Sequence, residues 1–394
     1  MKCLCFLFET RILQSYWDRY GMEHFIKLGY RLILVDLSPI LHPYSNKEIT
    51  TGLLQTPDAV IKTFRYKKDY KDFMSDIEDT TVFLLCLGFS YETSFIFRSL
   101  KKHRYGFLYR TDFTPDVWSV EDLKSRITKY IRGLSPRRIL QTVYHRVPRW
   151  IIPYKKAEFA VHGGSSDEEN IIRAELLSKS TKITYIHAFD FDQYLKVNKT
   201  DIKLVESRYC VFIDQYIPFH PDRLEDNLHI ESNIYYEELS HFLSEIQRKL
   251  QIKVVIAAHP RSDYEKHPEY FSQFGIYRFK TCELVRYSEF VFGHWSTALS
   301  FGLLYYKPIF LLSCSSFHRN DRKILEYFRD LLHAPVLNTF GDSLEENLQI
   351  IQNTSVDEIL YRKLIRKYLK GNYEPGIEYR LFAEELAAVI EIDK

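Results

Sequence analysis

The residues best suited to chemistry lie in the stretch 254–313, where short apolar runs end in polar groups. The run 254–258 stops at His259-Pro260-Arg261, and the run 289–293 stops at His294-Trp295-Ser296-Thr297. His and Arg side chains donate hydrogen bonds to phosphate oxygens, and free backbone N–H groups are available wherever a helix begins. The predicted phosphate site comprises His259, Pro260, Arg261, Gly293, His294, Ser296 and Thr297.

The elements that must position these residues are parallel strands. Each apolar run is short, rich in β-branched or aromatic residues and bounded by small or polar ones, as is typical of buried parallel strands. In open α/β sheets, ligands bind outside the carboxyl ends of such strands. Each motif also has a purely structural interpretation, because His-Pro is common turn chemistry and Ser-Thr at a helix start is commonly an N-cap.

Length and composition indicate an ordinary globular protein of more than one domain. The chain has 394 residues, of which 45% are hydrophobic and 27% charged, with a formal net charge of +2. This length favours two α/β domains over one core. The six cysteines form no Cys-x-x-Cys pair, which predicts free thiols in a reducing compartment. No stretch reaches the ~20 apolar residues of a membrane span, and the run 3–8 is too short for a signal peptide. We therefore expect a cytoplasmic protein, with association at the inner membrane face left open.

Strand-like runs alternating with helices predict an α/β protein with two Rossmann-like parallel-sheet domains facing a cleft. In the first half these runs lie at residues 3–8, 31–35, 81–87, 105–109, 159–161 and 183–186, with a helix at 17–28. In the second half they lie at 209–213, 254–258, 289–293 and 308–312, with helices at 235–250 and 379–390. We assign residues 1–205 to the first domain, with a linker at 196–205, and residues 206–375 to the second. A C-terminal helix in 376–394 can pack back on the first domain. A Gly-x-Gly-x-x-Gly motif is missing, so nothing favours a dinucleotide.

A basic segment covers residues 124–156. It contains ten Lys or Arg residues and no acidic residue, and Trp150 lies near its end. Basic, amphipathic segments with interleaved aromatic residues are typical of contacts with anionic lipid. We expect an anionic membrane surface as a possible partner and expect no nucleic acid. The alternatives are a solvated helical face and a phosphate-backbone contact.

The second half resembles the His-Pro-motif transferases of bacterial surface glycans, which are GT-B-type glycosyltransferases. The matching residues are His259-Pro260 and the Ser296-Thr297 pair within residues 293–297, and the resemblance covers mainly residues 209–315. This family includes sialyltransferases, Kdo transferases of capsule and lipopolysaccharide and, more distantly, teichoic-acid glycerophosphotransferases. The resemblance implies a CMP- or CDP-activated donor whose phosphate contacts the histidine and the hydroxyl. It makes the first domain the acceptor side and the second the donor side.

The resemblance leaves the catalyst open, because the first half lacks the Asp/Glu-Asp-Gly acceptor motif of the sialyltransferases. Asp214, at the end of the run 209–213, is our first candidate for a base or nucleophile, and Glu9, at the end of the run 3–8, is the second. A turn cap is the structural alternative for Asp214. On the acceptor side, the polar residues that follow strand-like runs are Arg11, Ser90, Arg110, His162 and Gly163.

No metal and no other cofactor is expected. Asp190-Phe191-Asp192 has the form of the Asp-x-Asp sequence with which one glycosyltransferase class binds a divalent ion. A monophosphate leaving group can be stabilised by His, Arg and a helix N-terminus alone, so the Asp-x-Asp is not needed.

The sequence therefore predicts a metal-independent glycosyltransferase that moves a sugar from a nucleotide donor to a surface glycan or glycolipid. One alternative is a sugar-nucleotide epimerase of related two-domain fold. The other is a non-catalytic protein that binds membrane or nucleic acid and keeps a vestigial phosphate site.

Overall fold

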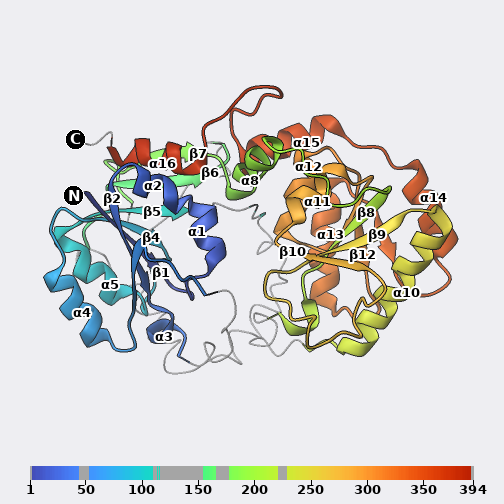
Figure 1. Ribbon diagram of the computed structural model, residues 1–394, viewed down its shortest axis with the longest axis horizontal. Coiled ribbons are helices and arrows are strands. Elements are labelled where there is room, and N and C mark those ends of the chain that lie inside the picture. Colours follow the sequence, from blue (N-terminus) through green and yellow to red (C-terminus); the bar gives the residue numbers. More distant parts are fainter. Residues whose placement is uncertain are drawn as a thin grey trace. The chain divides into compact units, whose positions relative to one another are not determined.

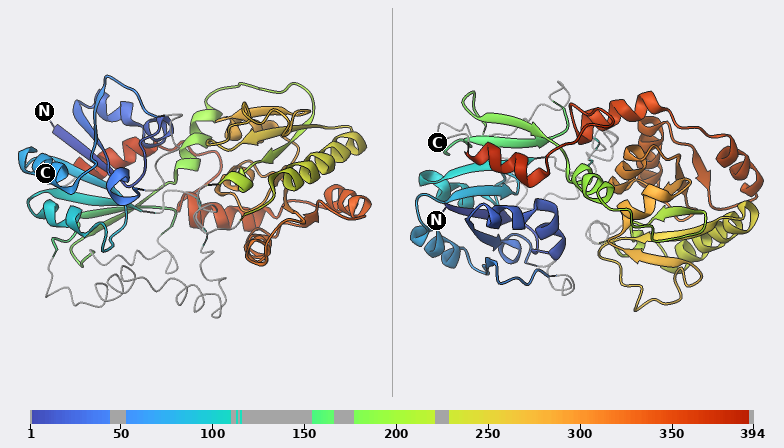
Figure 2. Two further views of the ribbon diagram at one scale, coloured as in Figure 1. Left: turned by 90° about the horizontal axis from the view of Figure 1, so that it is seen from below. Right: turned by 45° about the horizontal axis from the view of Figure 1, so that its top comes forward.

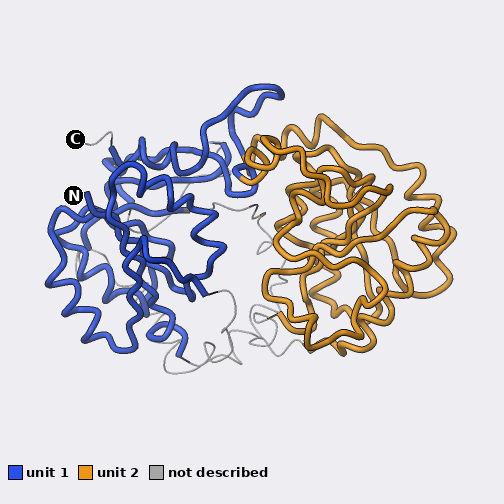
Figure 3. The backbone as a smooth tube through the Cα atoms, in the orientation of Figure 1, with its two compact units in different colours: residues 1–111, 122–192, 370–394 blue, residues 112–121, 193–369 orange. Residues whose placement is uncertain are grey.

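The computed structural model describes residues 2–43, 53–109, 113, 115, 154–165, 177–220 and 229–391. The chain forms two compact units, shown in different colours in Figure 3. The first unit takes residues 1–111, 122–192 and 370–394, and the second takes 112–121 and 193–369. The chain thus passes into the second unit near residue 193 and returns to the first at residue 370.

The first unit is built on a seven-stranded sheet in the order β3-β2-β1-β4-β5-β6-β7. All neighbouring strands are parallel. The strands are β1 (Lys2–Phe8), β2 (Tyr30–Asp36), β3 (Ala59–Thr63), β4 (Val82–Cys86), β5 (Arg104–Tyr109), β6 (Phe159–Gly163) and β7 (Lys182–Ile186). The helices are α1 (Gln14–Tyr20), α2 (Met22–Lys27), α3 (Ser38–Leu41), α4 (Lys67–Asp76), α5 (Ser94–Ser99), the 3₁₀ turn η1 (Leu100–Lys102) and α16 (Phe382–Glu391). Helix α8 (Phe189–Asn198) begins in the first unit and ends in the second.

Strand β1 shows why this sheet is buried on both faces. Its side chains alternate between two cores, with Cys5 and Leu7 in one and Leu4 and Phe6 in the other. A strand points successive side chains to opposite faces, so a continuous apolar run is what a doubly covered sheet needs. Helices α4 and α5 contribute to the first core, and α1, α2 and α16 contribute to the second (Figure 1).

A single glycine divides the helix expected at 17–28 into α1 and α2. Gly21 has φ 60°, in the left-handed region, and ends α1. A Cβ at this position would lie 2.7 Å from the Cβ of Ala383 in α16, so the close approach also requires glycine. Helix α16 therefore packs directly on α2, and it also contacts β7 (Figure 2).

The second unit is built on a six-stranded parallel sheet in the order β10-β9-β8-β11-β12-β13. The strands are β8 (Tyr209–Ile213), β9 (Lys253–Ala258), β10 (Gly275–Arg278), β11 (Val291–Gly293), β12 (Ile309–Ser313) and β13 (Val336–Asn338). The helices are α10 (Ser232–Leu250), α11 (Thr281–Tyr287), α12 (Ser300–Leu304), α13 (Arg319–Leu332), α14 (Leu344–Asn353) and α15 (Glu358–Leu364). Shorter turns are η4 (Ile217–Phe219), η5 (Thr297–Leu299) and the π-helical η6 (Ile365–Leu369).

The fold class predicted from the sequence is confirmed, since both sheets are parallel and carry helices. The strands β3, β10 and β13 were not predicted, and all three lie at sheet edges. Edge strands bury less surface, so their sequences carry a weaker apolar signal; β3 and β10 contain no fully buried residue. Helix α8 continues to Asn198, so the predicted linker at 196–205 begins within this helix.

Candidate functional site

The carboxyl edge of the second sheet carries the predicted phosphate residues. Strand β8 lies between β9 and β11 in this sheet. Asp214 and Gln215 follow β8, His259 follows β9, and the segment from His294 to Thr297 follows β11. Because neighbouring strands lie about 4.8 Å apart, the segments after β9 and β11 are separated by about 10 Å across β8.

His259 is a neutral hydrogen-bond donor in this arrangement. Burial lowers its pKa to about 3, and the neighbouring charges of His220 and Arg261 act in the same direction. The backbone N–H of Arg261 donates to Nδ1 of His259 at 3.2 Å, so the ring proton belongs on Nε2. This half-buried ring offers an N–H group without a positive charge, while exposed Arg261 supplies the charge beside it. Pro260 is exposed in the same turn.

Ser296 begins the 3₁₀ turn η5, as an N-cap. The backbone N–H of Ala298 donates to its Oγ at 3.2 Å, which leaves the hydroxyl hydrogen of Ser296 available for a ligand. Thr297 is exposed at the first position of the turn. Gly293 is the last residue of β11 and is closely packed, since a Cβ there would lie 3.0 Å from Cδ2 of Leu299. The sequence thus correctly located a helix start here, and its phosphate-binding role stays a prediction.

His294 belongs to the core and not to this site, which corrects the expectation from the sequence. Its side chain is completely buried. Nδ1 lies 2.7 Å from the carbonyl oxygen of Leu312, and Nε2 lies 2.9 Å from the hydroxyl of Tyr235. With both ring nitrogens engaged inside the unit, His294 stabilises the ends of β11 and β12 and is not exposed to a ligand.

Asp214 is also buried, with 3% of its surface exposed. The hydroxyl of Tyr264 donates to Oδ2 at 2.6 Å, and the backbone N–H of Tyr216 donates to Oδ1 at 2.9 Å. Burial raises the pKa of Asp214 above its ordinary value, although these hydrogen bonds oppose the rise. Both carboxylate oxygens are therefore occupied, and the geometry favours the turn-cap interpretation over a general base.

Glu9 and Arg11 follow β1 in the first unit, at the carboxyl edge of its sheet. Glu9 is half-buried, and burial raises its pKa, with His42 opposing the effect. Nη1 of Arg11 donates to Oδ2 of Asp36 at 3.3 Å, at the end of the neighbouring strand β2. Asp36 is held in turn by the backbone N–H of Ser38 at 2.9 Å. Glu9 is thus a carboxyl group of raised pKa that is partly accessible, as a proton acceptor requires.

The other predicted acceptor-side residues are Ser90, Arg110, His162 and Gly163, and those that the structure describes make local hydrogen bonds or lie buried in a strand. Ser90 joins a hydrogen-bonded turn before α5, in which its backbone N–H donates to Oγ1 of Thr93 at 2.8 Å. His162 and Gly163 lie buried in β6, and Nδ1 of His162 is 2.5 Å from the carbonyl oxygen of Gly163. The structure therefore gives Ser90 and His162 local structural roles, while Arg110 lies outside the described residues.

The Asp-x-Asp sequence forms part of a buried polar cluster in the first unit. Oδ1 of Asp192 lies 3.1 Å from Nε2 of His187 and accepts the backbone N–H of Phe382 at 2.6 Å. Nδ1 of His187 is 3.4 Å from Oε2 of Glu385, and Glu385 pairs with Lys370 at 2.8 Å. Asp192 therefore ties α16 to the end of β7, which is a structural task. Among the described residues, there is no group of three or more His, Cys, Asp or Glu suited to a metal ion.

The basic segment lies mostly outside the described residues, since only its last three positions are described. Of these, Lys155 pairs with Glu158 at 2.9 Å and donates to the carbonyl oxygen of His103 at 2.7 Å. No helix in the described ranges is both long and apolar enough to cross a membrane.

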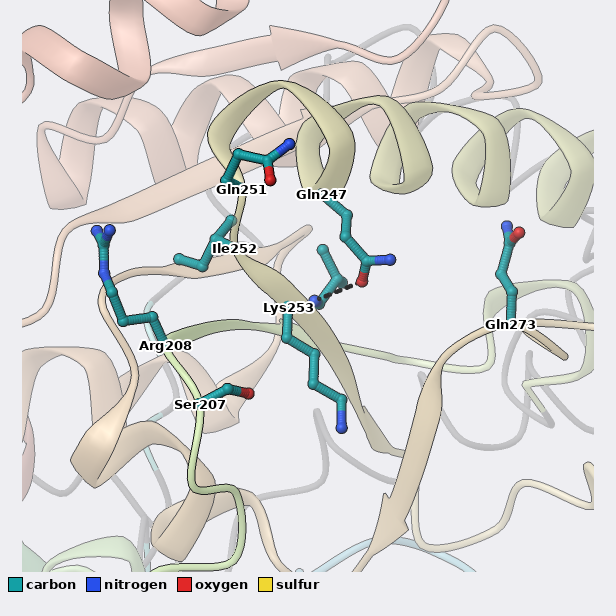
Figure 4. Close-up of a pocket in the computed structure, with 8 residues that line it drawn as sticks. Ser207, Arg208, Gln247, Gln251, Ile252, Lys253 and Gln273 are labelled. Carbon is teal, nitrogen blue, oxygen red and sulfur yellow. Dashed lines mark hydrogen bonds between the residues drawn. The ribbon is translucent and has the colours of Figure 1, made fainter.

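A hollow of about 630 Å³ lies at the opposite, amino end of the second sheet. It is open and lined mostly by polar side chains, including Arg208, Gln247, Lys253 and Gln273 (Figure 4). The backbone N–H of Val254 donates to Oε1 of Gln247 at 3.0 Å. Because α/β sheets bind ligands at the carboxyl ends of strands, this hollow is not the expected ligand crevice.

Two residues with clear positions at the site were missed from the sequence. Oε1 of Gln215 accepts the backbone N–H of Trp295 at 2.9 Å, and Tyr264 donates to Asp214. A glutamine directly after a strand is a weak signal, although its place beside Asp214 at a strand end was visible. Nothing in the sequence pairs Tyr264 with Asp214, which lies fifty residues earlier.

No protein-family model matches the sequence, and no curated protein matches it. Solved structures match its fold over nearly the whole chain. UGT89C1 of Arabidopsis thaliana, complexed with UDP-L-rhamnose, is 11% identical with a TM-score of 0.53, covering 99% of this chain and 98% of that one. The wall teichoic acid polymerase TagF, as a variant soaked with CDPG, is 12% identical with a TM-score of 0.52, covering 100% and 88%. A putative UDP-N-acetylglucosamine 2-epimerase of Listeria monocytogenes is 11% identical with a TM-score of 0.51, covering 100% and 96%. The protein therefore has the GT-B type of fold, with two parallel-sheet domains.

Proposed function

We propose that the protein is a GT-B-type glycosyltransferase that transfers a sugar from a cytidine-activated donor to a surface glycan or glycolipid. The observation that carries the proposal is the pair of segments flanking β8 in the second unit. One presents the neutral Nε2–H of His259 beside Arg261, and the other presents the Ser296 hydroxyl at a helical turn. The GT-B fold supports this reading, since fold neighbours were solved with UDP-L-rhamnose and with CDPG.

The proposed chemistry centres on the leaving phosphate. As the bond between sugar and phosphate breaks, negative charge grows on the phosphate oxygens. His259 Nε2–H, the Arg261 guanidinium and the Ser296 hydroxyl stabilise this charge without rearranging. Because these donors belong to the protein, we expect transfer to continue in the presence of a chelator.

The choice of cytidine rests on the resemblance of His259-Pro260 and Ser296-Thr297 to the His-Pro-motif transferases. The fold neighbours include a protein solved with a uridine nucleotide sugar, so the nucleotide has to be measured. On the acceptor side, we propose Glu9 as the base, since it is half-buried with a raised pKa. Arg11, held by Asp36, is proposed to contact the acceptor.

The experiment is a binding panel with CMP, CDP, UMP, UDP, GDP and dTDP, read by thermal shift and calorimetry on the full chain. A ligand at 100 times its dissociation constant stabilises the protein by about 2.7 kcal/mol, which gives a clear rise in the melting temperature. We expect CMP or CDP to bind and the other nucleotides to bind more weakly. If UDP or GDP binds while CMP and CDP do not, the cytidine assignment is overturned. If none of the six nucleotides binds, the enzyme assignment is overturned.

An epimerase of related fold is separated from a transferase by its products. We expect the nucleotide donor to release free CMP slowly in water and faster with an acceptor glycan. Conversion of a nucleotide sugar to its epimer, without release of nucleotide, would instead identify an epimerase. Activity lost in EDTA and restored by manganese would contradict the metal-independent mechanism.

A further inference from the structure

The end of β8 supplies two consecutive side chains that contact the segments on either side of it. Asp214 accepts a hydrogen bond from Tyr264, in the segment after β9. Gln215 accepts a hydrogen bond from the backbone of Trp295, in the segment after β11. Since β8 is flanked by β9 and β11, these two residues connect the His259 segment and the Ser296 segment through one strand end.

On the β9 side, the link is short and buried. Tyr264 is 6% exposed and donates to Asp214 at 2.6 Å. The turn between His259 and Tyr264 is closed by Ser262, whose backbone N–H and hydroxyl donate to the carbonyl oxygen of His259 at 2.9 and 2.8 Å. Holding Tyr264 therefore restricts the backbone from which the His259 ring projects.

On the β11 side, the link ends one residue before the N-cap. The backbone N–H of Trp295 donates to Oε1 of Gln215 at 2.9 Å, and Ser296 then caps η5. The Trp295 ring packs on Phe317, with ring centroids 5.1 Å apart. Gln215 therefore fixes where the turn begins, and with it the Ser296 hydroxyl.

We infer that Asp214 and Gln215 are positioning residues that set the separation between the His259 and Ser296 segments of the nucleotide site. The inference rests on the proposed function, because the separation matters only when both segments bind one ligand. A misplacement of about 1 Å is enough to impair a site whose donors converge on one group. Asp214 then acts through Tyr264 and not on the reacting atoms.

The first measurement needs no ligand. Amide hydrogen exchange is followed in the full chain for Tyr264→Phe, which removes the hydroxyl, and for Gln215→Met, which removes the acceptor at similar size. We expect Tyr264→Phe to speed exchange at residues 259–264 and Gln215→Met to speed it at 295–299. Gln247→Met is the matched control, because it also removes a glutamine oxygen that accepts a backbone N–H, but at the amino end of the sheet. Unchanged exchange at both segments would overturn the inference.

The second measurement is the dissociation constant of the nucleotide that the wild type binds, taken well below the melting temperature. We expect Tyr264→Phe and Gln215→Met each to weaken binding about fivefold to tenfold, the scale of one net hydrogen bond. Asp214→Asn combined with Tyr264→Phe should be no weaker than the worse single variant, because both changes break one link. The control Gln247→Met should lose a similar amount of stability while its affinity stays unchanged.

The outcomes separate the inference from the proposed function. Gln247→Met weakening nucleotide binding as much as Gln215→Met would overturn the inference, since general loss of stability would then explain both. Wild-type protein that binds none of the six nucleotides would overturn the proposed function. In that case the exchange measurement still decides whether the end of β8 orders the two segments.

Discussion

Tyr264 donates a 2.6 Å hydrogen bond to Oδ2 of Asp214, and both side chains are buried. Burial holds the pKa of Tyr264 well above its ordinary value, so the tyrosine keeps its proton and is the donor. Asp214 also accepts the backbone N–H of Tyr216. A carboxylate with both oxygens occupied and away from solvent is a poor acceptor for a substrate proton, which is why we assign it to positioning.

Asp214→Asn should therefore act mainly on donor binding. Loosening the link to Tyr264 should raise the KM for the donor about fivefold to tenfold, while kcat at saturating donor changes less than tenfold, because Asp214 does not touch the reacting atoms. Steady-state kinetics at varied donor concentration measures both constants. A fall in kcat of about 100-fold or more at unchanged nucleotide affinity, the scale of a lost general base, would return Asp214 to the catalytic role.

Glu9→Gln should act on kcat and leave nucleotide affinity unchanged, since the nucleotide residues belong to the other unit. We expect a loss of about 100-fold or more if Glu9 is the base. Burial raises the pKa of Glu9 above its ordinary value, so wild-type activity should fall as the pH drops through this raised pKa. Glu23→Gln, an exposed change on α2, is the control. An acid limb of the pH–rate profile that persists in Glu9→Gln would exclude this assignment.

His259 should stay neutral throughout the physiological pH range. Its pKa in the folded state is lowered to about 3 from 6.5, so the unfolded chain binds the extra proton first. The stabilising contribution is therefore present above pH 6.5 and is lost as the pH falls toward 3. Nitrogen NMR of the ring should show the neutral Nε2–H form at pH 6, while exposed His241 serves as a comparison. A His259 ring that titrates near 6.5 would contradict the burial argument.

His259→Ala should weaken binding of the nucleotide at least tenfold, because a desolvated donor to a charged phosphate is lost. His241→Ala, on the exposed face of α10, should leave the affinity unchanged. Calorimetry with the wild-type ligand measures the difference. Equal affinities for the two variants would remove His259 from the site.

The His187 cluster should make the first unit less stable at alkaline pH. Burial opposes the charged form of His187, but Asp192 and Glu385 outweigh it and raise the pKa above 6.5. The contribution is thus complete below pH 6.5 and is lost as the pH rises through the folded-state pKa, with a slope of at most about 1.4 kcal/mol per pH unit.

Hydrogen exchange of β7 and α16 at pH 6, 7, 8 and 9 measures this loss. His187→Gln should abolish the pH-dependent part, because glutamine cannot titrate, and His241→Gln should keep it. Glu385 and Lys370 face the same cluster. Burial alone would raise the pKa of Glu385, but His187 and Lys370 outweigh burial and lower it. Glu385 therefore adds stability above pH 4.5 and does not titrate between pH 6 and 9. A pH dependence that survives in His187→Gln would point to another group.

Charge reversal at Arg137 and Arg138 should weaken binding to anionic liposomes. Each basic residue near such a surface contributes about 1 kcal/mol, so two reversals should reduce binding by more than tenfold. Turnover on a soluble acceptor should stay nearly unchanged, and liposome sedimentation measures the effect. Unchanged sedimentation would return the segment 124–156 to a solvated face, and competition by a nucleic-acid duplex would favour the alternative partner.

Local sequence was sufficient for the central strands and for the edge on which the candidate site lies. Strands such as β1, β8 and β9 are buried on both faces, so their sequences are continuous apolar runs with polar residues directly after them. Parallel pairing brings those polar residues to one edge of a sheet, so the sequence alone locates His259, Ser296 and Asp214 at strand ends of the second sheet. The edge strands and the helix break at Gly21 could not be predicted from the local sequence, because both depend on which distant segments pack against them.

Only the tertiary structure decided what each polar residue does. His294 and Ser296 are two positions apart in the same motif, yet one is buried between Leu312 and Tyr235 while the other caps a turn with its hydroxyl accessible. Asp214 and Gln215 acquire their roles from Tyr264 and Trp295, which lie 50 and 80 residues away in the chain. The physical reason is that burial and hydrogen-bond partners set the protonation and accessibility of a side chain. Those partners come from distant segments that no local pattern pairs.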